Sequence, residues 1–256
     1  MQNFIYLDNN STTPIDSRVL ETMMPFLKDQ FANASSNHFL GLKTKQAVID
    51  AKANVADLLN ADSKQIVFTS GATEAINLVL KSFSLQKNQK HIVTLQTEHK
   101  AILDTCKYLE SIGFDVTYLP VKSNGLLELE QLKSAIRPDT LLVSVMWVNN
   151  ETGVIQDIKS ISEICNQSGT LFMTDATQAV GKIPVDVSEW NIDFLTFSGH
   201  KFYAPKGVGA LYYSKKGKKQ LMPQIHGGGQ ENSLRSGTLN TAAIVGLGKA
   251  CKIILG

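Results

Sequence analysis

Short apolar runs rich in β-branched and aromatic residues recur along the chain from residue 65 onward. Most are bounded by polar residues or glycine, a pattern typical of strands that are buried on both faces. The intervals between most of them are long enough to hold a helix. Seven strands are therefore expected, at residues 65–70, 91–96, 115–121, 140–148, 171–174, 192–197 and 207–214.

The segments between these runs show helical spacing. Ile76, Val79, Leu80 and Phe83 follow the pattern i, i+3, i+4, i+7, which places them on one face of a helix. The helices expected on such grounds lie within residues 19–27, 45–59, 75–83, 100–113, 158–166 and 242–255, with Gly113 and Gly169 as helix stops.

Strands that alternate with helices predict an α/β fold, in which a mostly parallel seven-stranded sheet is covered by helices on both faces. Ligands of such sheets bind beyond the carboxyl ends of the strands. The polar residues that directly follow each strand are therefore the functional candidates. The first 60 residues contain no convincing strand, and we expect them to pack on a second domain or a partner subunit.

Composition narrows the class of protein. With 256 residues, of which 43% are hydrophobic, the chain can bury a large core. The net charge of +2 gives no indication of a nucleic-acid partner, and the basic run at residues 215–219 is expected to be a solvated loop. No secretory signal and no apolar stretch of about 18 residues is visible, so no membrane partner is expected.

The cysteines and histidines bear on the cellular compartment and on metal binding. Three widely separated cysteines are incompatible with a disulfide framework and fit a reducing compartment. The five histidines lack the spacing of metal ligands. The sequence therefore predicts a cytoplasmic protein without a bound metal.

The turn after the first expected strand is a candidate phosphate site. Gly71, Ala72 and Thr73 lead straight into a helix, whose first N–H groups and positive dipole end attract anions. An ordinary strand-to-helix turn with a serine or threonine cap would have the same sequence, so both interpretations stand. No GxxxxGK[ST] motif occurs, which argues against a P-loop.

Two further strand ends carry polar groups. His99 opens a helix after the second expected strand, as a catalytic or stacking residue or as an ordinary surface residue. Asn149, Asn150 and Glu151 follow the fourth strand, as turn formers or as ligand contacts.

The fifth and sixth strands end in charged residues. Asp175 follows an apolar strand, where its carboxylate needs a donor or a cation unless it caps a helix. Lys201 follows the next strand, either as an amine nucleophile with a lowered pKa or as a solvated charge. An anion cradle, an acid, a stacking histidine and a lysine at one sheet edge are the groups that pyridoxal phosphate requires.

Seven segments carry a family resemblance. They are YLDNNSTTP (6–14), VFTSGATEAIN (67–77), TEHKAILDTC (97–106), VNNETGVIQDI (148–158), TDATQAVGKIPVD (174–186), FSGHKFYAPKGVGALY (197–212) and HGGGQENSLRSGT (226–238). In this order they resemble the cysteine desulfurases of the nitrogen-fixation and iron–sulfur-assembly type, which are fold-type I pyridoxal-phosphate enzymes related to class V aminotransferases. The resemblance covers nearly the whole chain.

The resemblance implies a role for each matching residue. Lys201 would form the Schiff base with pyridoxal phosphate, and Asp175 would contact the pyridinium nitrogen. His99 would stack over the ring and serve in acid–base chemistry. Gln178 and Asn150 would contact the hydroxyl side of the ring or the substrate.

The remaining implied contacts concern the phosphate and the partners. Ala72, Thr73, Ser198 and His200 would hold the phosphate, and Thr238 would reach the phosphate of the other subunit's cofactor. The resemblance thus implies a homodimer with shared active sites. It also implies L-cysteine as substrate and an iron–sulfur scaffold or another sulfur-acceptor protein as partner. Arg235 is expected to be a loop or interface residue.

Four positions depart from the family pattern: Ser11, Ala34, Met173 and Ala204 stand where alanine, proline, histidine and glycine are common. None removes an implied cofactor contact, although Met173 is expected to alter the packing under the ring.

The end of the chain departs more. Family members continue further and form most of a small domain, with the cysteine that accepts sulfur and the arginine that binds the substrate carboxylate. We expect residues 1–15 to belong with that small domain and residues 16–256 to form the cofactor-binding large domain. Cys106, Cys165 and Cys251 match no loop cysteine and are expected to be buried. The truncated chain is then expected to be unable to complete desulfuration.

Three alternatives remain. The first is a selenocysteine lyase or another class V enzyme, such as an aminotransferase or epimerase. The second is a non-catalytic remnant of a pyridoxal-phosphate domain. The third, an α/β hydrolase, is suggested by HGGG at 226–229 but lacks any GxSxG motif.

Overall fold

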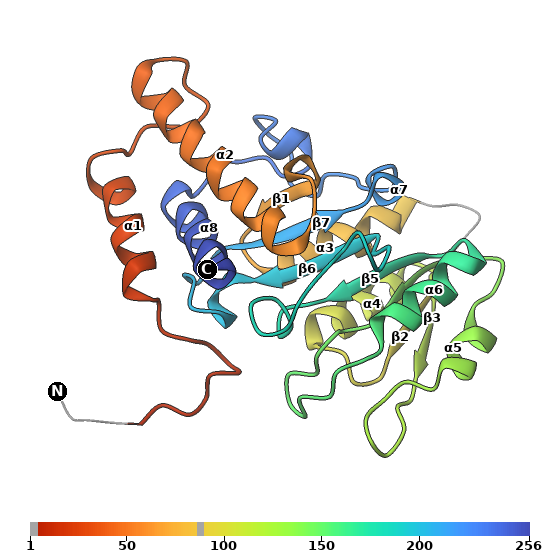
Figure 1. The fold of residues 1–256 in the computed structure, drawn as a ribbon. Helices are drawn as coiled ribbons and strands as arrows, with labels where there is room; N and C mark the ends of the chain where they lie inside the picture. The colour runs from red at the N-terminus through yellow and green to blue at the C-terminus, as the bar shows by residue number, and fades with distance from the viewer. Residues whose placement is uncertain (1–4, 86–89) are drawn as a thin grey trace.

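The computed structural model describes residues 5–85 and 90–256. A seven-stranded sheet with the strand order β1-β7-β6-β5-β4-β2-β3 forms its centre (Figure 1). All seven expected strands are confirmed. They are β1 (Ile66–Thr69), β2 (His91–Leu95), β3 (Asp115–Leu119), β4 (Thr140–Ser144), β5 (Leu171–Asp175), β6 (Phe194–Ser198) and β7 (Gly209–Tyr213).

The sheet is mostly parallel, as expected. β2, β3, β4, β5 and β6 pair in parallel, while β7 lies antiparallel between β1 and β6. β1 therefore runs in the same direction as β6. The carboxyl ends of all strands except β7 consequently meet at one edge of the sheet, where the candidate residues lie.

All six expected helices are present, but the one expected at residues 45–59 begins six residues earlier, at Phe39. The expected ones are α1 (Ser17–Lys28), α2 (Phe39–Leu59), α3 (Ala72–Ser82), α4 (Lys100–Ser111), α6 (Ile158–Ser168) and α8 (Thr241–Leu255). Gly169 caps α6 with a φ of 73°, and Gly113 follows α4 with a φ of 93°, so both expected stops are confirmed.

Two short helices were not expected: α5 (Leu129–Ala135) and α7 (Lys215–Lys218). The interpretation of residues 215–219 as a plain loop is therefore wrong. The side chain of Ser214 accepts a hydrogen bond from Gly217 N at 2.9 Å and caps α7. Gly217 is buried, and a Cβ there would lie 2.8 Å from a ring carbon of Phe194.

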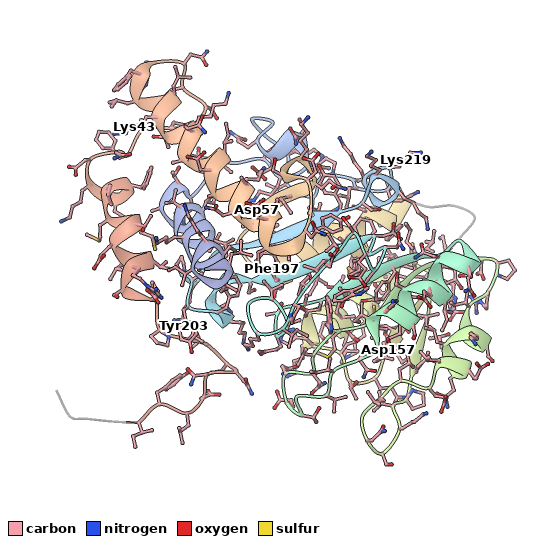
Figure 2. The ribbon with its side chains drawn as sticks, viewed as in Figure 1. Lys43, Asp57, Asp157, Phe197, Tyr203 and Lys219 are labelled. Atoms are coloured by element: carbon pink, nitrogen blue, oxygen red, sulfur yellow. The ribbon has the colours of Figure 1, made fainter. Side chains whose placement is uncertain are left out.

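Each face of the sheet has its own apolar core. Phe194 and Tyr213 face α3 and α4, whereas Phe172 and Phe197 face the layer that includes α2, α6 and α8. In Figures 1 and 2, α1, α2 and α8 form a group of helices, and Phe197 lies on the sheet beneath it. Both faces are therefore buried except at the edge strand β3, which is why most strand sequences are apolar rather than alternating.

α2 and α8 approach each other closely. A Cβ on Gly248 of α8 would lie 2.5 Å from the Cα of Ala51 on α2, so only glycine fits there. α1 packs on the same helix, where a Cβ on Gly246 would lie 2.7 Å from the sulfur of Met23. This three-helix group supports the half of the sheet that carries β1, β7 and β6.

The loop between α7 and α8 is anchored by a buried carboxylate. Glu231 Oε2 accepts hydrogen bonds from Phe68 N and from Lys52 Nζ, both at 2.8 Å. Glu231, Asn232 and Ser233 have positive φ angles of 48°, 57° and 64°. Such a run is strained for residues other than glycine, and the buried contacts of Glu231 hold it in place.

Within residues 5–85 and 90–256, no helix is long and apolar enough to cross a membrane. The described residues also contain no group of three or more histidine, cysteine, aspartate or glutamate side chains suited to a metal ion.

Candidate active site

A cavity of about 490 Å³ opens at the carboxyl ends of the parallel strands. Nine of the ten residues that the sequence singled out line it. They lie at or shortly after the carboxyl ends of β1, β2, β4, β5 and β6, which meet at one edge of the sheet. These residues are Ala72, Thr73, His99, Asn150, Asp175, Gln178, Ser198, His200 and Lys201.

The turn between β1 and α3 is held by β6. Gly71, at the N-cap of α3, has a φ of 154° and no side-chain cap, so a serine or threonine cap is excluded. Ser198 Oγ instead accepts a hydrogen bond from Ala72 N at 2.7 Å. A Cβ on Gly71 would lie 3.2 Å from Ser198 Oγ. The first turn of α3 therefore faces the cavity with helical N–H groups and a hydroxyl.

Asp175 is a buried acid at the end of β5. It is 5% exposed, and its Oδ1 accepts a hydrogen bond from Thr177 N at 3.0 Å. It ends the strand and leads into turns, so it does not cap a helix. Burial raises the pKa of Asp175, while hydrogen bonding from the side chain and main chain of Thr177 and the charge of Lys201 lower it.

Met173, two residues earlier on β5, does not reach the cavity. It is fully buried in the core beneath α3 and α4. The departure from histidine at this position therefore places an apolar side chain inside the core.

Lys201 is held by the N-terminal segment. Its Nζ donates hydrogen bonds to the carbonyl oxygens of Asn10 and Ser11, both at 2.7 Å. Burial lowers the pKa of Lys201, while the carboxylates of Asp175 and Asp8 raise it. The lysine is thus a partly desolvated amine on the cavity wall, rather than a freely solvated surface charge.

Gln178 connects the same segment to a second lysine. Its Nε2 donates to the carbonyl oxygen of Asn10 at 2.8 Å, and its Oε1 accepts from Lys182 Nζ. Burial, followed by repulsion from Lys201, lowers the pKa of Lys182. The amide of Gln178 is consequently fixed in one orientation, with its NH₂ group toward residue 10.

Two histidines line the cavity in different surroundings. His99 caps α4, and its Nδ1 accepts a hydrogen bond from Ala101 N at 3.1 Å. The neutral ring of His99 therefore carries its proton on Nε2. His200 Nδ1 pairs with the hydroxyl of Thr12 at 3.0 Å, and burial together with Lys201 and Lys206 lowers its pKa.

The residues of the loop after β4 were expected to be turn formers or ligand contacts. The structure gives one residue the first role and places the other two on the cavity wall. Asn149 Oδ1 accepts hydrogen bonds from the main chain of Glu151 and Thr152, so Asn149 forms the turn. Asn150 and Glu151 line the cavity and are joined by a 2.7 Å hydrogen bond. They remain available as ligand contacts.

Thr238 lies apart from the other nine residues. It is exposed on the loop that precedes α8 and does not line the cavity. Arg235, on the same loop, forms an ion pair with Glu74 of α3 at 2.9 Å. Arg235 is thus a loop anchor within this chain.

Sequence reasoning missed several residues of the cavity wall. Asp8, Asn10 and Ser11 line it, as do Met146, Val148 and Thr177. The polar run that follows Leu7 was the available signal for the first group, but nothing local connects it to a lysine about 190 residues away. Thr13 also bonds the carbonyl oxygen of His200, at 2.9 Å.

The three cysteines are buried, as expected. Burial raises the pKa of Cys106 and of Cys165 to about 12 and raises the pKa of Cys251 further. None of them lines the cavity. These thiols are therefore inert structural groups.

Comparison with known proteins agrees with this geometry. Residues 5–255 match the family model described as aminotransferase class-V. A cysteine desulfurase IscS of Neisseria meningitidis serogroup C is 54% identical over 252 residues. That match covers 97% of this chain and 62% of the relative. A mitochondrial cysteine desulfurase of Arthroderma benhamiae is 52% identical over 254 residues, covering 97% of this chain and 50% of the relative.

Solved structures of similar fold are also found. A NifS-like protein superposes with a TM-score of 0.95 at 43% identity, covering 98% of this chain and 69% of its own. A structure described as SspA in complex with cysteine also has a TM-score of 0.95, at 45% identity. That match covers 97% of this chain and 72% of the SspA chain. The chain thus spans between 50% and 62% of the length of the two curated relatives named above.

Proposed function

Because the chain belongs to the class-V aminotransferase family, we propose that it is the cofactor-binding part of a pyridoxal-phosphate-dependent cysteine desulfurase. The complete protein would remove sulfur from L-cysteine, release L-alanine and pass the sulfur to an iron–sulfur scaffold or another acceptor protein. Support comes from relatives named cysteine desulfurase, at 52% and 54% identity, and from the neighbour solved with cysteine.

One observation carries the proposal. A half-buried lysine, a buried acid and the N-terminus of a helix face a single cavity, through Lys201, Asp175 and Ala72. A lysine, an acid and an anion site in this combination match the aldehyde, the ring nitrogen and the phosphate of pyridoxal phosphate. No single one of these residues would justify the assignment.

The residues present fit this cofactor. Thr177 lines the cavity next to Asp175, whose carboxylate accepts a hydrogen bond from Thr177 N at 3.0 Å. Gly71 keeps the turn before α3 free of a side chain next to Ser198. When bound, pyridoxal phosphate supplies an aldehyde that condenses with amines and a ring that withdraws electrons from a substrate's α-carbon.

Different residues of the chain then act on different parts of the cofactor. Lys201 supplies an amine whose lowered pKa increases its unprotonated, nucleophilic fraction at neutral pH. Asp175 presents a carboxylate to a protonated ring nitrogen. The first turn of α3, with Ser198 and His200, binds the phosphate through N–H, hydroxyl and imidazole groups.

Three further residues bind and orient the ring and the substrate. His99 lies at the cavity with its proton on Nε2, where it can stack on a ring and exchange a proton with a substrate. Asn150 and Gln178 offer amide groups to the ring hydroxyl or to the substrate. Gln178 is already fixed by Asn10 and Lys182.

The sulfur-accepting thiol and the partner subunit complete the proposal. Cys106, Cys165 and Cys251 are buried with raised pKa values, so none of the three is suited to accept sulfur. We assign that step to a thiol outside residues 1–256. Exposed Thr238 is proposed to reach the cofactor phosphate of a second subunit in a homodimer.

The cofactor assignment is tested by reconstitution of the purified chain. We expect added pyridoxal phosphate to give visible absorbance and, after borohydride reduction and digestion, a cofactor-modified peptide that contains Lys201. Lys201→Ala should lose both signals. Lys182→Ala, which removes a neighbouring lysine, should keep them. A folded wild-type chain that binds no cofactor, or modification that persists in Lys201→Ala, would overturn the assignment.

The substrate is tested on the loaded chain. We expect L-cysteine to change the absorbance of the bound cofactor at lower concentrations than L-alanine or L-serine do. An equal response to all three amino acids would argue for another class V reaction.

A further inference from the structure

Glu98 is a buried carboxyl group immediately behind the cavity. It lies between the end of β2 and the N-cap of α4 and is 5% exposed. Its Oε1 accepts a hydrogen bond from Met146 N at 2.7 Å. Its Oε2 is buried and makes no hydrogen bond with any residue in the described part of the chain.

The groups that act on Glu98 do not favour a negative charge. From β5, the carboxyl group of Asp175 repels it, and from α4 the uncharged, buried thiol of Cys106 lies near it. Within residues 5–85 and 90–256, no lysine, arginine or histidine forms an ion pair with it. A buried carboxylate with one N–H donor and no cation is strongly disfavoured over the neutral acid. Burial accordingly raises the pKa of Glu98 well above its usual range.

Asp175 has the opposite surroundings. It is equally buried, but the positive charge of Lys201 acts on it. When two neighbouring carboxyl groups repel each other, the one with the better cationic partners ionises and the other keeps its proton. The geometry thus places the proton on Glu98 and the charge on Asp175.

Glu98 also fixes the wall of the cavity. Met146 lines it, and the next residue, Trp147, donates from its N to the carbonyl oxygen of Asp175 at 3.0 Å. Two consecutive N–H groups of one segment are therefore bonded to Glu98 and to Asp175. His99, adjacent to Glu98 in sequence, lines the same cavity and caps α4.

We propose that Glu98 is a positioning residue that remains protonated, holds the main chain of Met146 through Oε1 and leaves Asp175 as the one charged carboxyl group behind the cavity. The protonation of Glu98 is a property of the chain alone. Its consequence for the cofactor rests on the proposed function. Glu98 acts through Met146 and Asp175, without a contact of its own to the ligand.

The protonation is measured first on protein without added cofactor. Infrared spectra of the wild type and Glu98→Gln should differ by one protonated-carboxyl C=O band, present in the wild type at pH 6 to pH 9 and lost in Glu98→Gln. Glu163→Gln, which removes an exposed carboxyl group on α6, should leave that band in place. A wild type that lacks the band, or in which the band disappears between these pH values, would overturn the proposal.

The consequence is measured by cofactor binding. Glu98→Gln is neutral and keeps the acceptor for Met146 N, so its affinity for pyridoxal phosphate should stay within about threefold of the wild type. Glu98→Leu removes the acceptor and should weaken binding by about tenfold or more, because Met146 N is left unsatisfied. If Glu98→Leu fails to fold, Glu98→Gln still decides: a loss of binding as large as that of Asp175→Asn would overturn the proposal.

The two proposals can fail separately. If the wild type binds no pyridoxal phosphate but shows the infrared band, the proposed function fails and the protonation of Glu98 stands. If the wild type binds the cofactor but lacks the band, the positioning role of a neutral Glu98 fails alone.

Discussion

Arg235 Nε donates a hydrogen bond to Glu74 Oε1 at 2.9 Å, and this ion pair joins the loop before α8 to the first turn of α3. Glu74 also accepts from Ser70 N at 2.7 Å. Burial opposes the ionisation of Glu74, but these partners outweigh it and lower its pKa. The loop that presents Thr238 is thus fixed to the turn that faces the candidate phosphate site.

Breaking this ion pair should destabilise the fold. The two side chains are 23% and 18% exposed, so we expect Arg235→Met to lower the free energy of unfolding by about 1–3 kcal/mol. Urea unfolding of Arg235→Met, Glu74→Gln and the double variant would give the coupling energy. Lys133→Met, in the exposed pair with Glu130, is the control and should change little. A coupling energy below about 0.3 kcal/mol would contradict this prediction.

Gly209 should be intolerant of any side chain. A Cβ there would lie 2.3 Å from the carbonyl oxygen of Phe197 and 2.7 Å from the Cα of Gly71. Gly209→Ala must push β7 away from β6 and from the turn before α3, at a cost of about 3 kcal/mol or more. Gly153→Ala, where the space is open, should cost only about 1 kcal/mol for its φ of 73°. Similar melting temperatures for the two variants would refute the packing argument.

His91 should make the fold sensitive to acid. Its ring lies between the hydroxyls of Thr140 and Thr117, at 2.7 Å and 2.9 Å. Burial lowers its pKa below the ordinary value of 6.5, and Arg137 adds to this effect while Asp115 and Asp139 oppose it.

The sign follows from proton uptake. Between the lowered folded pKa and 6.5, the unfolded chain binds more protons, so this contribution to stability is complete above pH 6.5 and is lost as the pH falls. Melting temperatures from pH 8 to pH 5 should therefore fall less steeply in His91→Asn than in the wild type. Parallel pH profiles would show that His91 does not carry this dependence.

Removing the charge of Asp8 should make Lys201 less basic. The carboxylate of Asp8 raises the pKa of Lys201. Asp8→Asn should therefore shift the pH at which an amine-specific reagent begins to label Lys201 to lower values. Peptide mass mapping would separate this lysine from the others. Asp104→Asn, on the exposed face of α4, should leave the labelling curve unchanged. A shift to higher pH would reverse the assigned electrostatics.

The fold was predictable because every strand except the edge strand β3 is a buried apolar run. β4, β5 and β6 are buried along their whole length, so burial itself produced the sequence signal. α5 gave no such signal because it is seven residues long and buries only Leu132. α7 depends on Ser214 and on the packing of Gly217 under Phe194, which are contacts that a lysine-rich run does not reveal.

The cavity was predictable to the extent that its residues follow strands. Asp175 and Lys201 were found because the carboxyl ends of parallel strands meet at one edge. Asn10 was missed because its contacts with Gln178 and Lys201 join segments about 170 and 190 residues apart. The burial of Glu98 was not predicted, because this residue lies in the polar stretch TEHK, which is typical of the start of a helix. The chemical roles of the cavity residues remain predictions.

Glu231 has a consequence beyond the loop that it anchors. β1 ends the sheet on one side, and Glu231 Oε2 occupies the main-chain donor of Phe68 at that margin. A strand from another molecule could bond there only by displacing a carboxylate that is 4% exposed and paired with Lys52. The protein is thereby protected against edge-to-edge aggregation at β1, the edge strand that leads into the turn of its candidate phosphate site.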